Sequence, residues 1–385
     1  MGDSMGKVGL LQFDPTVGDL EQNVHRLSSL ATQAQQAGAT VGISTELAVC
    51  GYPPRDLLME RDFVQRSMQA ALSMRTPLPV LIGTPIPAED DRTLPTNGVV
   101  RSGPDATSIT NDEHGRIVAE KQLLPTYDVF DEARYFAAKN RSGLARSFGG
   151  LTLGVTVCED AWQSAGMTPS SYAQDPIEHI AEWTRQGVDI NATVNLSASP
   201  FHTEKFTTRL AVARHAAAVL NHPFLLANQV GGNDDLLFDG RSLVVWPDGR
   251  AVVAPSWQEG VLVVDLEDAH ACTWVPSQAD DALCIGSSTL MVLEPGDDGS
   301  SFVDTIEELT NAVVTGLADY CRKSSIGSIV LGLSGGIDSA VAACVAAEAI
   351  GPANVTGLAM PSRHSSQHSI DDALHTAQAL GMQHH

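Results

Sequence analysis

The sequence predicts an α/β protein built from two successive domains, and three observations support this. Short apolar runs alternate with amphipathic or Ala-rich segments over most of the 385 residues, a length that allows two separate cores. Residues 266–301 lose this alternation, becoming rich in acidic and small residues. Beyond them, the apolar run 329–333 leads directly into SGGIDS and an Ala-rich segment, which predicts a strand, a phosphate-binding loop and a helix. We therefore expect domains at 5–265 and 302–385 with a linker at 266–301.

The first domain is expected to mix strands and helices throughout. Val8 to Phe13 predicts a strand, and Asp19 is placed to cap a helix that runs to about Gln36, where Gly38 stops it. The same patterns predict further helices at 63–74, 176–186 and 203–221. Further strands are expected at 41–44, 79–83, 151–157, 190–196 and 224–227, with hairpins joining 109–110 to 117–119 and spanning 242–253.

The second domain is expected to open with a helix from Phe302, because apolar residues recur there at three- and four-residue steps as far as Tyr320. After the SGGIDS segment, 355–360 predicts a strand and 370–380 a helix. Roughly eighty residues are too few to complete a doubly wound nucleotide-binding sheet. We therefore expect this domain to be incomplete at His385.

Composition excludes several classes of function. The formal net charge is −23, from 23 Lys and Arg against 46 Asp and Glu, so the long-range field repels nucleic acid and anionic membranes. No apolar stretch is long enough to span a bilayer, and the N-terminus lacks the pattern of a signal peptide. Six scattered cysteines without a Cys-x-x-Cys pair favour reduced thiols over disulfides or zinc. A cytoplasmic enzyme is the expectation.

The SGGIDS loop, residues 334–339, has the features of a pyrophosphate site. Its two glycines let backbone N–H groups approach an anion, Ser334 and Ser339 add hydroxyl donors, and the next helix begins there. It is not a Walker A loop, because no Gly-Lys-Ser/Thr follows the glycines. It resembles the loop of ATP-pyrophosphatases, enzymes that adenylate a carboxylate and release pyrophosphate. A glycine-rich turn before a core helix is the plainer alternative.

Three residues of the first domain follow directly on predicted strands: Glu46, Lys121 and Cys158. Because strand ends converge in a sheet, these side chains could meet as a general base, an oxyanion stabiliser and a nucleophile. Taken singly, each has a commoner explanation, since a buried Cys beside a strand usually packs in the core and a Glu or Lys at a strand end is usually solvated.

Resemblance favours the catalytic interpretation. The runs TELAVCGYPPRD (45–56), KQLLPTY (121–127) and VCEDAW (157–162) are similar, in order, to the three signatures of the nitrilase, or carbon–nitrogen hydrolase, superfamily. With the pyrophosphatase loop downstream, residues 7 to 383 resemble the glutamine-dependent NAD synthetase family. That resemblance implies a nitrilase-like α-β-β-α sandwich followed by the first part of a doubly wound, parallel-sheet nucleotide-binding domain.

The resemblance also implies roles in the first domain. Cys158 would attack the carboxamide of glutamine, Glu46 would act as general base, and Lys121 with the backbone N–H of Glu159 would stabilise the oxyanion. Glutamine contacts would come from Tyr127, Glu132, Glu159, Ser197 and Ser199, with Glu132 also positioning Lys121 and water.

In the second domain the resemblance implies that ATP adenylates the carboxylate of nicotinic acid adenine dinucleotide, which ammonia then amidates to give NAD, AMP and pyrophosphate. The phosphates would be held with Mg²⁺ by Ser334, Gly335, Gly336, Asp338 and Ser339, Asp338 being the metal ligand. The resemblance implies a homo-oligomer. It implies no prosthetic group and no zinc. Residues for the dinucleotide substrate are expected beyond His385.

Two other functions stay open from sequence. One is a stand-alone nitrilase-family amidase or carbamoylase, which would act on amides other than glutamine and be indifferent to ATP. The other is a non-catalytic scaffold that binds a nucleotide and a partner, for which an altered triad would be expected.

Overall fold

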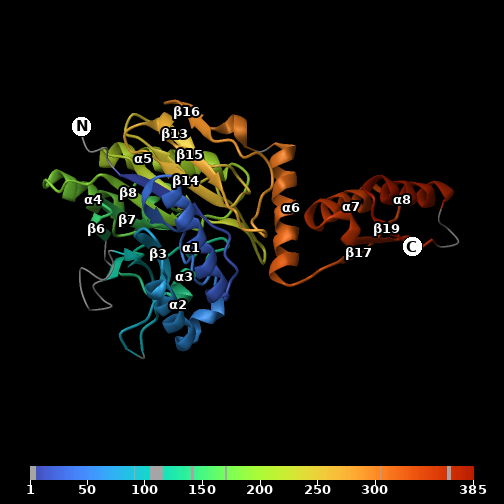
Figure 1. The fold of residues 1–385 in the computed structure, drawn as a ribbon, viewed down its shortest axis with the longest axis horizontal. Coiled ribbons are helices and arrows are strands. Elements are labelled where there is room, and N and C mark those ends of the chain that lie inside the picture. The colour runs from blue at the N-terminus through green and yellow to red at the C-terminus, as the bar shows by residue number, and fades with distance from the viewer. Residues whose placement is uncertain are drawn as a thin grey trace. The chain divides into compact units, whose positions relative to one another are not determined.

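A computed structural model describes residues 6–90, 92–104, 116–139, 143–169, 171–303, 305–361 and 366–385 (Figure 1). Contacts divide the chain into two compact units. The first comprises residues 1–231 and 238–303, and the second residues 232–237 and 304–385. The first strand of the hairpin expected at 109–110 lies outside the described residues. No helix in the described part is long and apolar enough to cross a membrane.

The first unit contains two large mixed sheets, each with seven strands among the described residues. In the first sheet, β1 pairs with β2 in parallel and with β14 antiparallel. Its strands, in spatial order, are β15 (Thr273–Pro276), β14 (Gly260–Val264), β1 (Lys7–Gln12), β2 (Ala39–Ile43), β3 (Val80–Ile86), β4 (Thr96–Ser102) and β5 (Ile117–Glu120).

In the second sheet, the central strand β8 has parallel neighbours on both sides, β7 and β9. Its strands, in spatial order, are β16 (Met291–Leu293), β13 (Ala251–Val253), β12 (Leu243–Val245), β9 (Phe224–Asn228), β8 (Ala192–Ser197), β7 (Leu151–Val157) and β6 (Gly143–Phe148).

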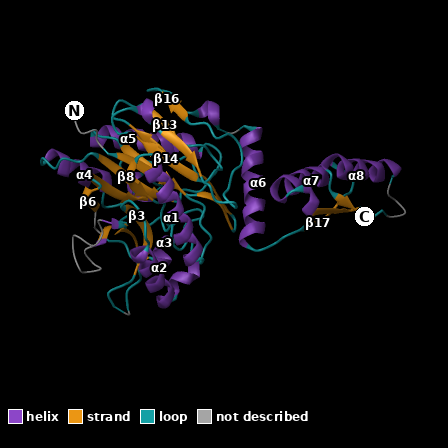
Figure 2. Cartoon of the chain, in the orientation of Figure 1, coloured by secondary structure: helices purple, strands orange, loops and turns teal. Residues whose placement is uncertain are grey.

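Three apolar clusters order these sheets and the helices into four layers (Figure 2). Alternate residues of one strand point to opposite faces, so in β1 Leu10 joins the core between the sheets and Leu11 joins the core beneath helices α1 (Leu20–Gln36) and α2 (Arg61–Ser73). Helices α4 (Pro176–Arg185) and α5 (Lys205–Leu220) cover the outer face of the second sheet. The expected α-β-β-α sandwich is confirmed.

The segment 266–301, expected as a linker, is instead partly built into both sheets. β15 pairs with β14, and β16 pairs with β13. Acidic and small residues flank these short edge strands, so composition hid them. Strands β4, β6 and β14 also went unpredicted from sequence.

Short elements complete the first unit. They are the 3₁₀ turns η1 (Arg55–Met59), η4 (Cys158–Ala161), η5 (Ala269–Ala271) and η6 (Ser300–Phe302), the one-turn helix α3 (Glu132–Tyr135), and part of a hairpin made of β10 (Val230–Asn233) and β11 (Leu236–Asp239). The tip of that hairpin, residues 232–237, belongs to the second unit.

The second unit is a small α/β layer. Helix α6 spans Ile306–Lys323, so it begins later than expected, because the Thr305 side chain caps it by accepting from Glu308 N. Strands β17 (Ile329–Gly332), β18 (Val355–Leu358) and β19 (Gln383–His384) are parallel and lie in chain order. Helices α7 (Ile337–Ile350) and α8 (Gln367–Leu380) connect them and share one apolar cluster, and η7 (Pro352–Asn354) precedes β18.

Candidate active site

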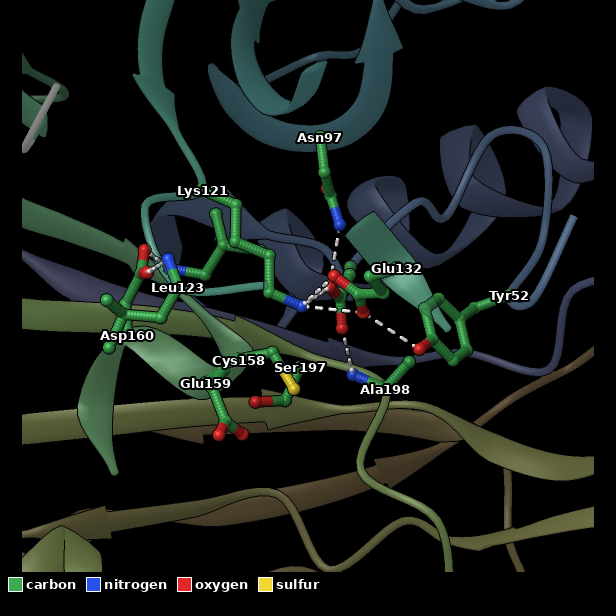
Figure 3. Close-up of polar contacts among 12 residues, drawn as sticks. Tyr52, Asn97, Lys121, Leu123, Glu132, Cys158, Glu159, Asp160, Ser197 and Ala198 are labelled. Carbon is green, nitrogen blue, oxygen red and sulfur yellow. Dashed lines mark hydrogen bonds and ion pairs between the residues drawn. The ribbon is translucent and has the colours of Figure 1, made fainter. Parts of the chain in front are cut away.

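The three strand ends singled out from sequence do converge in the first unit. Glu46 lies three residues after β2, Lys121 directly follows β5, and Cys158 directly follows β7. The first two strands belong to one sheet and the third to the other. Figure 3 shows the Cys158 side chain beside a cluster of polar groups that includes Lys121 and Glu132.

Glu46 and Lys121 form a fully buried ion pair. Lys121 Nζ lies 2.8 Å from Glu46 Oε1, and neither side chain is exposed. The Asn97 amide donates to the same oxygen at 2.7 Å, and Ala198 N donates to Glu46 Oε2 at 3.0 Å. Glu46 is therefore held by three donors that fix its orientation.

Glu132 also pairs with the ammonium, 2.8 Å from Lys121 Nζ, and accepts from Tyr52 Oη at 2.8 Å. Burial raises the pKa of Glu132 to about 7, opposed by the Lys121 ammonium and helped by the charge of Glu46. For Lys121, burial lowers the pKa, but Glu132 and Glu46 outweigh it, and the pKa lies well above its usual value. The amine is therefore a cation at neutral pH, as an oxyanion stabiliser must be.

Cys158 sits in a strained turn, with φ at +44° in the left-handed region that non-glycine residues rarely adopt. Its carbonyl accepts from Asn195 Nδ2 at 3.2 Å. Burial, followed by the charge of Glu46, raises the pKa of the thiol well above its ordinary value, against the effect of Lys121. The resting sulfur is thus protonated and needs a neighbouring base to become a nucleophile.

A second polar group borders the nucleophile. The Glu159 carboxylate accepts from Tyr127 Oη at 2.9 and 3.0 Å and from Tyr172 Oη at 3.5 Å. Lys205, at the start of α5, places its ammonium 4.3 Å from the centre of the Trp162 ring. Its pKa is lowered by burial and then by Arg209, while Cys158 and Glu159 act in the opposite sense.

The two predicted serines lie at the end of β8, where the chain turns toward Glu46. Ser197 O accepts from Glu46 N at 3.4 Å, and Ser197 Oγ donates to Asn195 Oδ1 at 2.5 Å. Ser199 N donates to Asn228 Oδ1 at 2.9 Å. Within the described residues, the buried Ser199 Oγ has no hydrogen-bond partner.

In the second unit the SGGIDS residues form a compact loop at the start of α7. Ser334 Oγ lies 3.1 Å from Ser339 Oγ and accepts from Gly336 N at 3.2 Å. Gly335 has φ at +75°, and a Cβ atom there would lie 2.3 Å from Ser369 O. Asp338 is in the first turn of the helix. Backbone N–H groups at a helix N-terminus are the donors that an anion prefers, and this loop lies at such an N-terminus.

Comparison with known families settles the class of the first unit. The carbon–nitrogen hydrolase family matches residues 7–274, and the NAD synthase family matches residues 309–385. The chain belongs to the carbon–nitrogen hydrolase family. An amidase structure from Nesterenkonia sp., 20% identical with a TM-score of 0.53, covers 70% of this chain and 95% of its own, which shows that the fold is shared.

Other relatives match almost the whole chain. A glutamine-dependent NAD(+) synthetase from Synechocystis sp. is 38% identical over 98% of this chain and 63% of its own length. The structure of glutamine-dependent NAD+ synthetase from Acinetobacter baumannii in complex with ADP is 26% identical with a TM-score of 0.76, over 98% of this chain and 64% of its own. The chain thus spans less than two thirds of these relatives.

Several residues of this carbon–nitrogen hydrolase site were missed from sequence. Asn97 and Lys205 lie outside the three signature runs, and nothing in their local pattern marks them. Tyr52 and Asp160 lie inside those runs, and Asp160 is next to the predicted Glu159, so their position was a usable signal.

Proposed function

We propose that the protein is a glutamine-dependent NAD synthetase whose first unit hydrolyses glutamine and whose second unit contributes to the ATP site. The observation that carries the proposal is the fully buried Glu46–Lys121 pair beside Cys158. Base, cation and thiol are the groups that an amide hydrolase with a covalent intermediate needs.

The acylation step follows from this geometry. Glu46 takes the proton of Cys158, and the sulfur attacks the side-chain carboxamide carbon of glutamine. Negative charge gathers on the former carbonyl oxygen, where the Lys121 ammonium and the Glu159 N–H stabilise it. The C–N bond then breaks, Glu46 returns the proton to the leaving nitrogen, and ammonia departs from a glutamyl thioester.

Hydrolysis of the thioester uses the same groups. Glu46 takes a proton from water, the resulting hydroxide adds to the thioester carbon, and the C–S bond breaks to release glutamate. The proton returns from Glu46 to Cys158, whose raised pKa favours the neutral thiol. Glu132 keeps the Lys121 ammonium in place through both steps.

Two opposite charges beside the nucleophile support glutamine as the amide. Glutamine carries an α-ammonium and an α-carboxylate, whereas a simple amide carries neither. The Glu159 carboxylate suits the ammonium and the Lys205 ammonium suits the carboxylate. Tyr127 would then orient Glu159, and the unpartnered Ser199 Oγ adds a further donor for the substrate.

In the second unit, ATP would adenylate the carboxylate of nicotinic acid adenine dinucleotide, with Ser334, Gly335, Gly336 and Ser339 around its phosphates. Ammonia then displaces AMP to give NAD. Mg²⁺ neutralises phosphate charge in such reactions, and it is commonly held by one or two carboxylates plus phosphates and water. Asp338 supplies one carboxylate at the helix start, which fits that donor set.

Other expectations stay proposals of the same kind. The six cysteines are all free thiols, which supports a reducing, cytoplasmic location. The homo-oligomer implied by the resemblance stays a prediction.

The test measures NAD formed by the full-length protein from ATP, Mg²⁺ and nicotinic acid adenine dinucleotide, with glutamine or ammonium as nitrogen source. We expect Cys158→Ala to abolish synthesis from glutamine and keep synthesis from ammonium. Glutamine or amide hydrolysis by the wild type without any NAD from either source would favour the stand-alone amidase instead.

A further inference from the structure

Asp160 joins the two segments that hold Lys121 and Cys158. Its Oδ1 accepts from Gln122 N and Leu123 N, each at 3.0 Å, and its Oδ2 accepts from Val157 N at 3.1 Å. The side chain is almost completely buried. Figure 3 shows Asp160 facing the Leu123 backbone beside Lys121.

These contacts cross from one sheet to the other. Gln122 follows Lys121 at the end of β5, in the first sheet, whereas Val157 precedes Cys158 at the end of β7, in the second. Strands of different sheets share no ladder of hydrogen bonds, so between the sheets it is chiefly side-chain packing that sets their separation. One carboxylate that binds amides from both strand ends fixes that separation directly.

The same contact supports the strained turn at the nucleophile. Cys158 has a positive φ, and a residue in that conformation persists only where surrounding contacts over-determine it. Asp160 binds Val157 N on one side of Cys158, and Asn195 binds the Cys158 carbonyl on the other.

We infer that Asp160 is a positioning residue, which sets the distance between the Cys158 sulfur and the Lys121 ammonium by tying their backbone segments together. The inference rests on the proposed hydrolysis for its kinetic consequence. It predicts that loss of one carboxylate oxygen lowers turnover by moving Cys158 relative to Lys121, without touching the groups that bind substrate.

Asp160→Asn is the sharpest variant, because it preserves side-chain volume and one acceptor oxygen but turns an N–H₂ group toward one of the two segments. We expect kcat for glutamine hydrolysis to fall on the order of 10- to 100-fold, as a misplacement of about 1 Å does, with KM unchanged. Asp160→Ser, with one short acceptor, repeats the comparison should the first variant fold poorly.

A second readout does not depend on glutamine. Iodoacetamide alkylates Cys158 Sγ with loss of iodide, and the thiol proton passes to Glu46. Peptide mass spectrometry follows Cys158, with the exposed Cys284 and Cys344 as internal references. Displacement from the base and cation should slow alkylation of Cys158 about tenfold or more, whereas general loosening would expose the thiol and speed it.

Glu259→Gln provides the matched control. Glu259 is also a buried carboxylate that accepts from a backbone amide, Asp14 N at 3.1 Å, and it pairs with Arg26 at 2.8 Å. Neither of these two contacts involves a residue of the candidate active site described above. Its substitution should cost stability but leave kcat and Cys158 alkylation unchanged.

Wild-type kinetics and alkylation in Asp160→Asn, a loss of kcat matched by a rise in KM, or faster alkylation would each overturn the inference. If the wild type fails to hydrolyse glutamine, the proposed function fails, while the alkylation comparison still tests Asp160.

Discussion

Lys121 Nζ lies 2.8 Å from Glu46 Oε1, with both side chains completely withdrawn from solvent. A buried pair of this kind is costly to desolvate and is weak evidence for stability in itself. Its place beside Cys158 gives it a chemical use, since the carboxylate can accept the thiol proton while the ammonium stays charged.

Removing the cation should affect both activity and stability. Lys121→Met leaves Glu46 and Glu132 buried without their shared partner, so we expect a loss of about 3–5 kcal/mol in the free energy of unfolding. Glutamine turnover should fall roughly 10²- to 10³-fold, the usual effect of losing an oxyanion donor. Urea unfolding and glutamate release measure the two effects.

Adding Glu132→Gln to Lys121→Met should restore part of the stability and none of the activity. Activity above a tenth of wild type in Lys121→Met would contradict the role assigned to Lys121.

Tyr52→Phe should move the acidic limb of the pH–activity profile upward. The Tyr52 hydroxyl lowers the pKa of Glu132, which burial raises to about 7, so its removal raises that pKa further. Because ionised Glu132 holds the Lys121 ammonium, the limb should move by about half a pH unit to one pH unit, the equivalent of one hydrogen bond. Burial also raises the pKa of Asp160 to about 7. Tyr52 donates its hydrogen bond to Glu132 and not to Asp160, so Tyr52→Phe should leave the pKa of Asp160 unchanged. An unmoved profile would show that Glu132 does not control this limb.

Substrate analogues should separate the roles of Lys205 and Glu159. Lys205→Met should raise KM about tenfold or more for glutamine and for glutaramate, which keeps the carboxylate, but not for 4-aminobutanamide, which lacks it. Glu159→Gln should raise KM for glutamine and for 4-aminobutanamide, which keeps the ammonium, but not for glutaramate, which lacks it. The variant retains the backbone N–H of residue 159 and loses only the charge proposed to face the α-ammonium. Steady-state kinetics on the three amides suffice. An equal rise in KM for all three amides in either variant would mean that Lys205 and Glu159 do not bind the α-carboxylate and α-ammonium of the substrate.

Gly335→Ala should disable the phosphate loop without harming glutamine hydrolysis. The new Cβ would lie 2.3 Å from Ser369 O, in addition to the strain of a φ of +75°. Gly381→Ala is the control, because its φ is +72° and no atom of the described residues lies within 4 Å of a Cβ there. We expect both variants to lose about 1–2 kcal/mol from backbone strain, and only Gly335→Ala to lose ATP binding by calorimetric titration. Equal ATP affinity in both variants would argue against a phosphate site at this loop.

Apolar runs located the strand ends that Glu46, Lys121 and Cys158 follow, but it was the resemblance to family signatures that favoured their convergence. Strand ends alone could not predict it, because two of these strands belong to one sheet and the third to the other. The sequence did not predict Asn97 or Lys205, which reach the site from a strand and a helix with no distinctive pattern of their own. The edge strands β15 and β16 were missed for a related reason. Such short segments become strands because they pair with a neighbouring strand, not because they are locally hydrophobic. That neighbouring strand cannot be identified from the segment's own residues.

Covalent catalysis by Cys158 is tested most directly by the mass of the Cys158 peptide after brief exposure of the protein to glutamine and acid quenching, together with the glutamate released without ATP. We expect a glutamyl thioester on Cys158, glutamate from the wild type, and neither product from Cys158→Ala. Glutamate formation that persists in Cys158→Ala, or an acyl group on another residue, would contradict covalent catalysis by Cys158.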